Sequence, residues 1–163
     1  GLIQLPSELS DSGVRYDGYA AALEAAGITA DPELIVEAGR REEDGYHATR
    51  ELLERPEPPT AILASSDDLA FGALHALHEA GLAVGRDVSL VGFDDVPLAA
   101  HVEPPLTTLR QPHRAVGEQL ANLLADLIEG RPRTTKRPML TPRLVVRRST
   151  GPLRDTHGKQ RHA

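Results

Sequence analysis

The chain has 163 residues, of which 40% are hydrophobic, and this is ordinary for one soluble globular unit with its own core. Its net charge of −6 argues against broad attraction to nucleic acid or to an anionic membrane, because both require a basic surface. The lack of cysteine excludes disulfides and thiolate chemistry, and no apolar run is long enough to span a bilayer. This composition is compatible with a reducing cytoplasm.

The first predicted elements are a strand and a helix. Residues 2–5 form a short apolar run, and residues 11–26 form a helical pattern that Asp11 or Ser12 begins and Gly27 ends. The apolar positions of this helix recur at spacings of three and four residues: Val14, Tyr19, Ala22, Leu23 and Ala26. Such spacing predicts one stripe that packs on a sheet.

Strands and helices are then predicted to alternate. They cover residues 34–38 (strand), 42–54 (helix), 60–64 (strand), 67–80 (helix) and 88–93 (strand). Because the connections are short, the alternation predicts right-handed crossovers in a parallel sheet. The expected fold class is therefore α/β, with a parallel doubly wound sheet.

Beyond residue 95 the pattern changes. Residues 96–105 predict an irregular connection, 106–110 a strand, 112–129 a long helix and 137–148 extended structure. Residues 151–163 are polar and predict a disordered tail. The chain starts without Met in what reads as a strand, so we expect it to be a fragment.

Polar residues follow two of the predicted strands. Ser66 and Asp67 come after residues 60–64, and Asp94 and Asp95 come after residues 88–93. The carboxyl ends of parallel strands form the ligand crevice of such sheets. The sequence therefore predicts a binding rim for a small polar ligand at this edge.

Six segments stand in a fixed order: RYDGYAAAL (15–23), PTAILASSD (59–67), AFGAL (70–74), DVSLVGFDD (87–95), PPLTTLRQP (104–112) and LVVRRST (144–150). In this order and spacing they resemble the effector-binding core of the LacI/GalR family of bacterial transcription regulators. The resemblance implies a type I periplasmic-binding-protein-like fold with two subdomains. It also implies a homodimer with a sugar or nucleoside-type effector in the cleft, and operator DNA bound only through a helix-turn-helix headpiece and its hinge helix.

The resemblance also implies a domain division. Residues 1–105 would form the distal effector-binding subdomain, 106–130 a strand and helix of the proximal subdomain, and 131–150 return strands to the distal subdomain, before the tail at 151–163. The headpiece and most of the proximal subdomain would lie outside this chain. The apolar face of the long helix would then lack its sheet and be exposed: Val116, Leu120, Leu123, Leu124 and Leu127.

Arg15 and Asp94 are the principal expected effector contacts. A cation in the first turn of a helix opposes the helix dipole, which hints at another role for Arg15, and the family uses its matching arginine to bind effector. An ionised Asp94 accepts hydrogen bonds from a vicinal diol, as the matching family residue does. From the residues alone, a solvated surface arginine and a turn aspartate remain open alternatives.

Four further residues complete the expected effector site. Ser66 stands where the family usually has Asn, and either Ser66 or Asp67 can instead cap the following helix; for Asp67, capping is the expected role. Arg41 aligns with a position where relatives place a stacking aromatic, so Arg15 and Arg41 together suggest a negatively charged ligand. Gln111 and His113 match positions across the cleft, although His113 can also be an ordinary residue of a helix N-terminus. Asp95 is expected to be structural.

Other chemistry is disfavoured. His75, His78 and Glu79 share a helix surface but read as solvated side chains, so no metal or other cofactor is predicted. No nucleophile with a base, P-loop or GxGxxG accompanies the aspartates, so an enzyme is not expected. The leading hypothesis is a cytoplasmic, sugar-responsive repressor core without a membrane segment. The alternative is a periplasmic sugar-binding protein of a transporter, followed by a sugar-phosphate enzyme.

Overall fold

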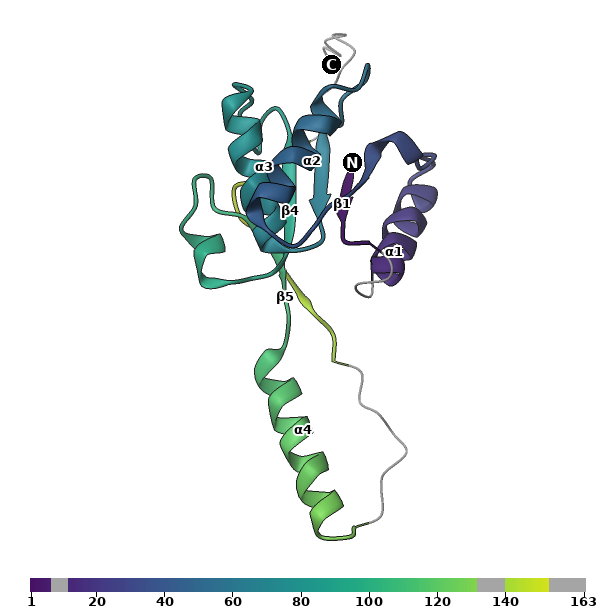
Figure 1. Ribbon diagram of the computed structural model, residues 1–163, viewed down its shortest axis with the longest axis vertical. Helices are drawn as coiled ribbons and strands as arrows, with labels where there is room; N and C mark the ends of the chain where they lie inside the picture. The colour runs from purple at the N-terminus through teal and green to yellow at the C-terminus, as the bar shows by residue number, and fades with distance from the viewer. Residues whose placement is uncertain (7–11, 132–139, 153–163) are drawn as a thin grey trace, which may run out of the picture.

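A computed structural model describes residues 1–6, 12–131 and 140–152 of the chain (Figure 1). The strands are β1 (Leu2–Gln4), β2 (Ile35–Glu37), β3 (Ala61–Ala64), β4 (Ser89–Asp94), β5 (Thr107–Arg110) and β6 (Arg143–Val145). The helices are α1 (Ser12–Ala25), α2 (Glu42–Leu53), α3 (Asp67–Glu79) and α4 (His113–Ile128). Short 3-10 helices, η2 (Pro32–Leu34) and η3 (Pro97–Ala100), lie in two of the connections.

The strands form one six-stranded sheet in the order β2-β1-β3-β4-β5-β6. All neighbouring pairs are parallel except β5 and β6, which are antiparallel. The chain moves along the sheet one way from β1 to β2 and the other way from β2 to β3. Right-handed crossovers therefore place α1 on the face opposite to α2 and α3. The predicted α/β, mostly parallel, doubly wound fold is confirmed.

The hydrophobic core lies between the sheet and the pair α2 and α3. Its largest buried side chains include Ile3, Leu52, Ile62, Leu69 and Leu90. The two helices approach closely at Gly45 and Gly72, where an added Cβ would overlap backbone atoms of the opposite helix. Glycine at both positions therefore brings the helix backbones into direct contact.

The stripe predicted for α1 is only partly correct. Tyr19 and Leu23 are half-buried, but Val14 is 72% exposed and Ala22 and Ala26 are also exposed. The half-buried face of the helix also includes Arg15. The spacing of apolar residues could not reveal that α1 packs shallowly beside the sheet, since that depends on the strands it meets.

Helix α4 projects from the body of the molecule (Figure 1). It is reached through β5, and the chain returns through β6, which pairs with β5 at the edge of the sheet. All sixteen residues of α4 are described, and none of them is buried. Part of the extended structure expected over residues 137–148, and nearly all of the tail expected over 151–163, lie outside the described residues.

Candidate functional site

The candidate site is built on the turn that ends β4. Asp94 has a φ of 119° and Asp95 a φ of 58°, so two consecutive non-glycine residues adopt left-handed backbone conformations. Each such residue costs on the order of 1 to 3 kcal/mol, and such strain concentrates at functional sites. The strand pairing places Asp94 directly beside Arg110 of β5.

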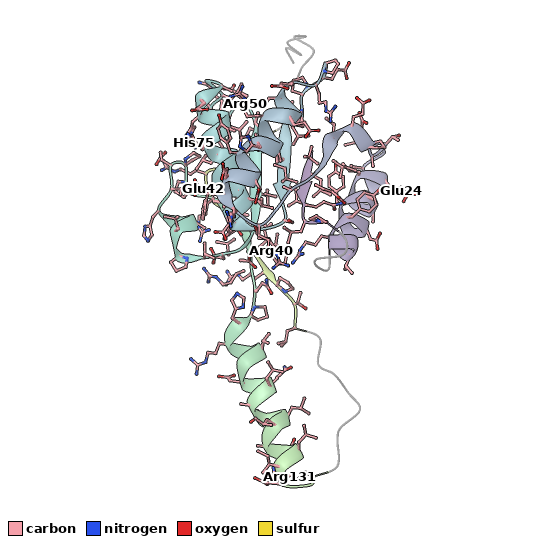
Figure 2. The ribbon with its side chains drawn as sticks, in the orientation of Figure 1. Glu24, Arg40, Glu42, Arg50, His75 and Arg131 are labelled. Carbon is pink, nitrogen blue, oxygen red and sulfur yellow. The ribbon has the colours of Figure 1, made fainter. Side chains whose placement is uncertain are left out.

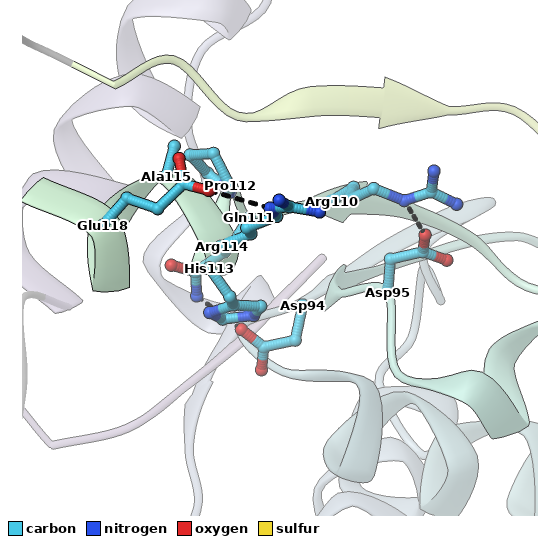
Figure 3. A pocket seen from close by; sticks show the side chains of 9 residues that line it. All are labelled: Asp94, Asp95, Arg110, Gln111, Pro112, His113, Arg114, Ala115 and Glu118. Carbon is cyan, nitrogen blue, oxygen red and sulfur yellow. Dashed lines mark hydrogen bonds and ion pairs between the residues drawn. The ribbon is translucent and has the colours of Figure 1, made fainter.

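An open hollow of about 490 Å³ lies where β4 and β5 end and α4 begins (Figure 3). The residues that line it are Asp94, Asp95, Arg110, Gln111, Pro112, His113, Arg114, Ala115 and Glu118. Three of the six predicted site residues are thus brought together: Asp94, Gln111 and His113. The Gln111 side-chain amide donates to Oδ1 of Asp94 at 2.5 Å, which leaves other lone pairs of that carboxylate available to a ligand.

Asp95 ties the turn to the two strands that connect to α4. Its side chain is 3% exposed and accepts from Arg147, at 2.6 Å, and from Nε of Arg110. Burial alone raises the pKa of Asp95, but the hydrogen bonds from Arg147 and Arg110 outweigh burial and hold this pKa below its ordinary value. These ion pairs support the structural role expected for Asp95, which also lines the hollow.

Arg15 reaches the same end of the sheet from α1. Its guanidinium carbon lies 4.6 Å from the centre of the Phe93 ring, a cation–π contact with the residue that precedes Asp94. Arg15 is half-buried, so it is not simply a solvated surface arginine. The structure therefore places the guanidinium against Phe93, next to Asp94 in the sequence, but Arg15 does not line the hollow.

The capping prediction for Asp67 is wrong. Ser66 is the N-cap of α3, and its hydroxyl accepts from the backbone N–H of Leu69 at 3.3 Å. Asp67 is instead buried, and it accepts from the Thr108 hydroxyl at 2.6 Å and from the Val96 N–H at 2.9 Å. Only contacts across the fold reveal this difference, since both residue types are common helix caps. Ser66 lies outside the lining of the hollow.

Arg41 is exposed at the N-cap position of α2, where its backbone N–H donates to Asp44 at 2.8 Å. It does not line the hollow. Figure 2 shows the neighbouring Arg40 at the end of the body from which α4 projects. The first turn of α4 carries His113 and Arg114, and Arg114 pairs with Glu118 at 2.8 Å.

The described residues form neither a metal-binding cluster nor a membrane-spanning helix. Within the described ranges, no group of three or more His, Cys, Asp or Glu side chains is arranged to hold a metal ion. His75 pairs with Glu79 of the same helix at 3.6 Å, and Figure 2 shows it on α3. No helix in the described part of the chain combines the length and apolar character required to cross a membrane.

Sequence reasoning missed Arg110, Arg147 and Thr108. Pairing of the predicted strands over residues 88–93 and 106–110 could have indicated that Arg110 lies beside the aspartates. No local signal marks Arg147, because it is 52 residues from its partner Asp95 in the sequence. Thr108 reads as an ordinary β-branched strand residue.

The chain matches the periplasmic binding protein-like domain family over residues 3–150. It is 39% identical over 157 residues to the HTH-type transcriptional repressor PurR of Escherichia coli O139:H28. The aligned residues make up 95% of this chain and 46% of PurR. The chain thus spans about half the length of the curated relatives it matches.

Solved structures agree in fold. The transcriptional regulator CelR in complex with cellobiose has a TM-score of 0.85 and 37% identity, over 91% of this chain and 46% of CelR. The lac repressor dimer bound to operator and the anti-inducer ONPF has a TM-score of 0.84 and 31% identity, over 93% and 52% of the two chains. The chain therefore belongs to the periplasmic binding protein-like domain family, and it is similar to the corresponding half of LacI-type transcriptional regulators.

Proposed function

We propose that this chain is the effector-sensing portion of a transcriptional repressor that responds to a sugar or sugar derivative. The observation that carries the proposal is the Asp94 carboxylate, which lies in the strained turn that ends β4 and accepts from Gln111, the residue after β5. A carboxylate, an amide and the nearby guanidinium of Arg15 supply the acceptors and donors that bind hydroxyl groups. The relatives are repressors and regulators, which favours this function over a transporter component or an enzyme.

The effector would act by shifting a conformational equilibrium. Residues 106–130, which contain β5 and α4, would belong to a second subdomain, and a ligand between the subdomains would stabilise one closure angle. Such a shift requires that the ligand bind the two closures with different affinity. The exposed apolar side chains of α4 support this division, because a helix with that face normally packs on a sheet.

The binding partners would be those of LacI-type transcriptional regulators. We propose a homodimer, with α3 and residues 96–105 as contact surfaces, and operator DNA bound through a helix-turn-helix headpiece outside this chain. The net charge of −6 agrees with DNA binding by another segment. The effector would carry negative charge, as in a sugar acid or phosphorylated sugar, because Arg15 contacts Phe93 near the end of β4 and Arg41 lies just after the end of β2.

The test is calorimetric titration of the full-length protein with neutral sugars, sugar acids and sugar phosphates. For the sugar that binds, Asp94→Asn is expected to weaken binding about 100-fold, because a charged hydrogen-bond partner is lost. Glu24→Gln makes the same chemical change on the exposed side of α1 and should leave affinity unchanged. Arg41→Ala should weaken binding of anionic sugars only.

Two results would count against the proposal. If the Asp94→Asn protein bound the sugar as tightly as wild type, Asp94 would not be the central effector contact. Equal preference for neutral sugars, or no loss on Arg41→Ala, would remove the anionic class while leaving a sugar sensor. Anisotropy with labelled operator DNA, with and without the sugar, then reports whether binding is coupled to DNA release or capture.

A further inference from the structure

Asp67 is a buried carboxylate that the hollow does not use. It is 1% exposed and does not belong to the lining residues. Burial raises its pKa above the ordinary value, although hydrogen bonds from Thr108 and Val96 oppose that shift. Carboxylates are rarely buried unless hydrogen bonds compensate for the cost of removing them from water.

The two oxygens of Asp67 hold the turn that follows β4. Oδ2 accepts from the Val96 N–H at 2.9 Å, and Oδ1 accepts from the Thr108 hydroxyl at 2.6 Å. The same Thr108 hydroxyl oxygen accepts from the Asp95 N–H at 3.3 Å. Asp67 therefore restrains two successive backbone amides, one directly and one through Thr108, which is fully buried in β5.

The packing around Asp67 is specific to this arrangement. Gly92 lies against it, and a Cβ at that position would overlap Oδ1 of Asp67 and press on Leu106. From the other side, Arg147 and Arg110 hold the side chain of Asp95. The turn is thus held from both sides. Such restraint is required because the left-handed conformations of Asp94 and Asp95 cost free energy and persist only where the surrounding structure holds them.

We propose that Asp67 and Thr108 are positioning residues for effector binding, which hold the β4 turn so that the Asp94 carboxylate faces Gln111 and the ligand. This inference rests on the proposed function, because the affected property is affinity for the effector. Neither side chain lines the hollow, so each acts through Asp94. Small displacements of a binding group cost affinity far beyond their effect on stability.

The test removes the Thr108 hydroxyl from the full-length protein. Thr108→Val keeps the size and shape of the side chain but loses both links, whereas Thr108→Ser keeps the hydroxyl. Thr49→Val is the matched control: Thr49 is equally buried, and its hydroxyl donates to the Gly45 carbonyl at 2.8 Å within α2. Thr108→Ala removes the same hydroxyl if the valine variant does not fold.

The readouts are calorimetric titration with cellobiose, ribose and glucose 6-phosphate, the melting temperature, and the crystal structure of the Thr108→Val protein. We expect Thr108→Val to bind about tenfold more weakly or worse than wild type, and Thr108→Ser to bind normally. Thr49→Val should lose melting temperature comparably and retain affinity. The crystal structure should show Asp94 displaced from Gln111.

Wild-type affinity in the Thr108→Val and Thr108→Ala variants would overturn the inference and leave the sugar sensor intact. Equal loss of affinity in Thr49→Val would also overturn it, because the effect would then follow stability alone. If none of the three sugars binds wild type, the sensor proposal is weakened, and the crystal structure decides this inference. An unchanged Asp94 to Gln111 bond would contradict it, and a displaced Asp94 would support it.

Discussion

Asp67 and Asp95 hold the same turn, but their pKa values are shifted in opposite directions. Both carboxylates are buried, and burial alone favours the neutral acid. Asp95 receives two arginines, which lower its pKa below 3.8, whereas Asp67 receives a hydroxyl and an amide, which do not offset burial. The difference therefore follows from the charge of the hydrogen-bond donors.

These shifts predict opposite pH dependences of stability. The lowered pKa of Asp95 means that its ionised form stabilises the fold above pH 3.8, and this contribution is lost as pH falls through the folded pKa. The raised pKa of Asp67 means that its contribution is present below pH 3.8 and is lost as pH rises through the folded pKa.

We therefore expect Asp95→Asn to lower the free energy of unfolding by roughly 2 kcal/mol at pH 7, with a smaller loss in acid. Asp67→Asn can still accept from Val96 and can donate to Thr108, so its stability relative to wild type should improve as pH rises. Urea unfolding of the full-length protein between pH 3 and 7 measures both. Parallel curves for the two variants would contradict the assignment.

At the scale of elements, the close contact between α2 and α3 sets how these two helices pack together over the sheet. Gly45 and Gly72 face the opposite helix backbone without a side chain between them. The buried positions of α3 alternate with exposed His75 and His78 on its outer surface. The glycines at the crossing are explained only by the neighbouring helix.

Gly72→Ala is accordingly expected to destabilise the protein by roughly 3 kcal/mol or more, because the new Cβ overlaps the Glu42 carbonyl and the Tyr46 N–H. Gly18→Ala is the control. Gly18 lies inside α1 with no atom near its Cβ position, so alanine should raise stability by about 0.5 to 1 kcal/mol. Chemical denaturation compares the two, and equal effects would exclude a close helix contact.

For the molecule as a whole, α4 is the feature that distinguishes this chain from a closed domain. Its exposed apolar side chains are Val116, Leu120, Leu123, Leu124, Leu127 and Ile128. Contiguous apolar surface of this kind is typical of an interface. The five residues predicted from the sequence to be exposed are exposed in the structure.

The 163-residue chain, produced alone, is therefore expected to bind a hydrophobic-patch dye and to self-associate. Leu120→Gln with Leu124→Gln should reduce both, because the two leucines are 60% and 58% exposed. In the full-length protein the same pair should destabilise, if a second subdomain covers this face. Sedimentation and dye fluorescence measure the outcome, and a soluble monomer with little dye binding would contradict it.

The order and type of the elements, and the placement of Ser66, Asp67, Asp94 and Asp95 at strand ends, were determined by the sequence alone. Those features depend on local patterns: apolar periodicity, proline and glycine at element ends, and strand direction. The tertiary structure decided that Asp67 holds the β4 turn, that Arg147 reaches Asp95, and that α1 packs shallowly. The first two contacts join residues that are 29 to 52 positions apart in the sequence, so no local pattern predicts them. The third depends on how deeply a helix packs on its sheet, which local spacing does not determine.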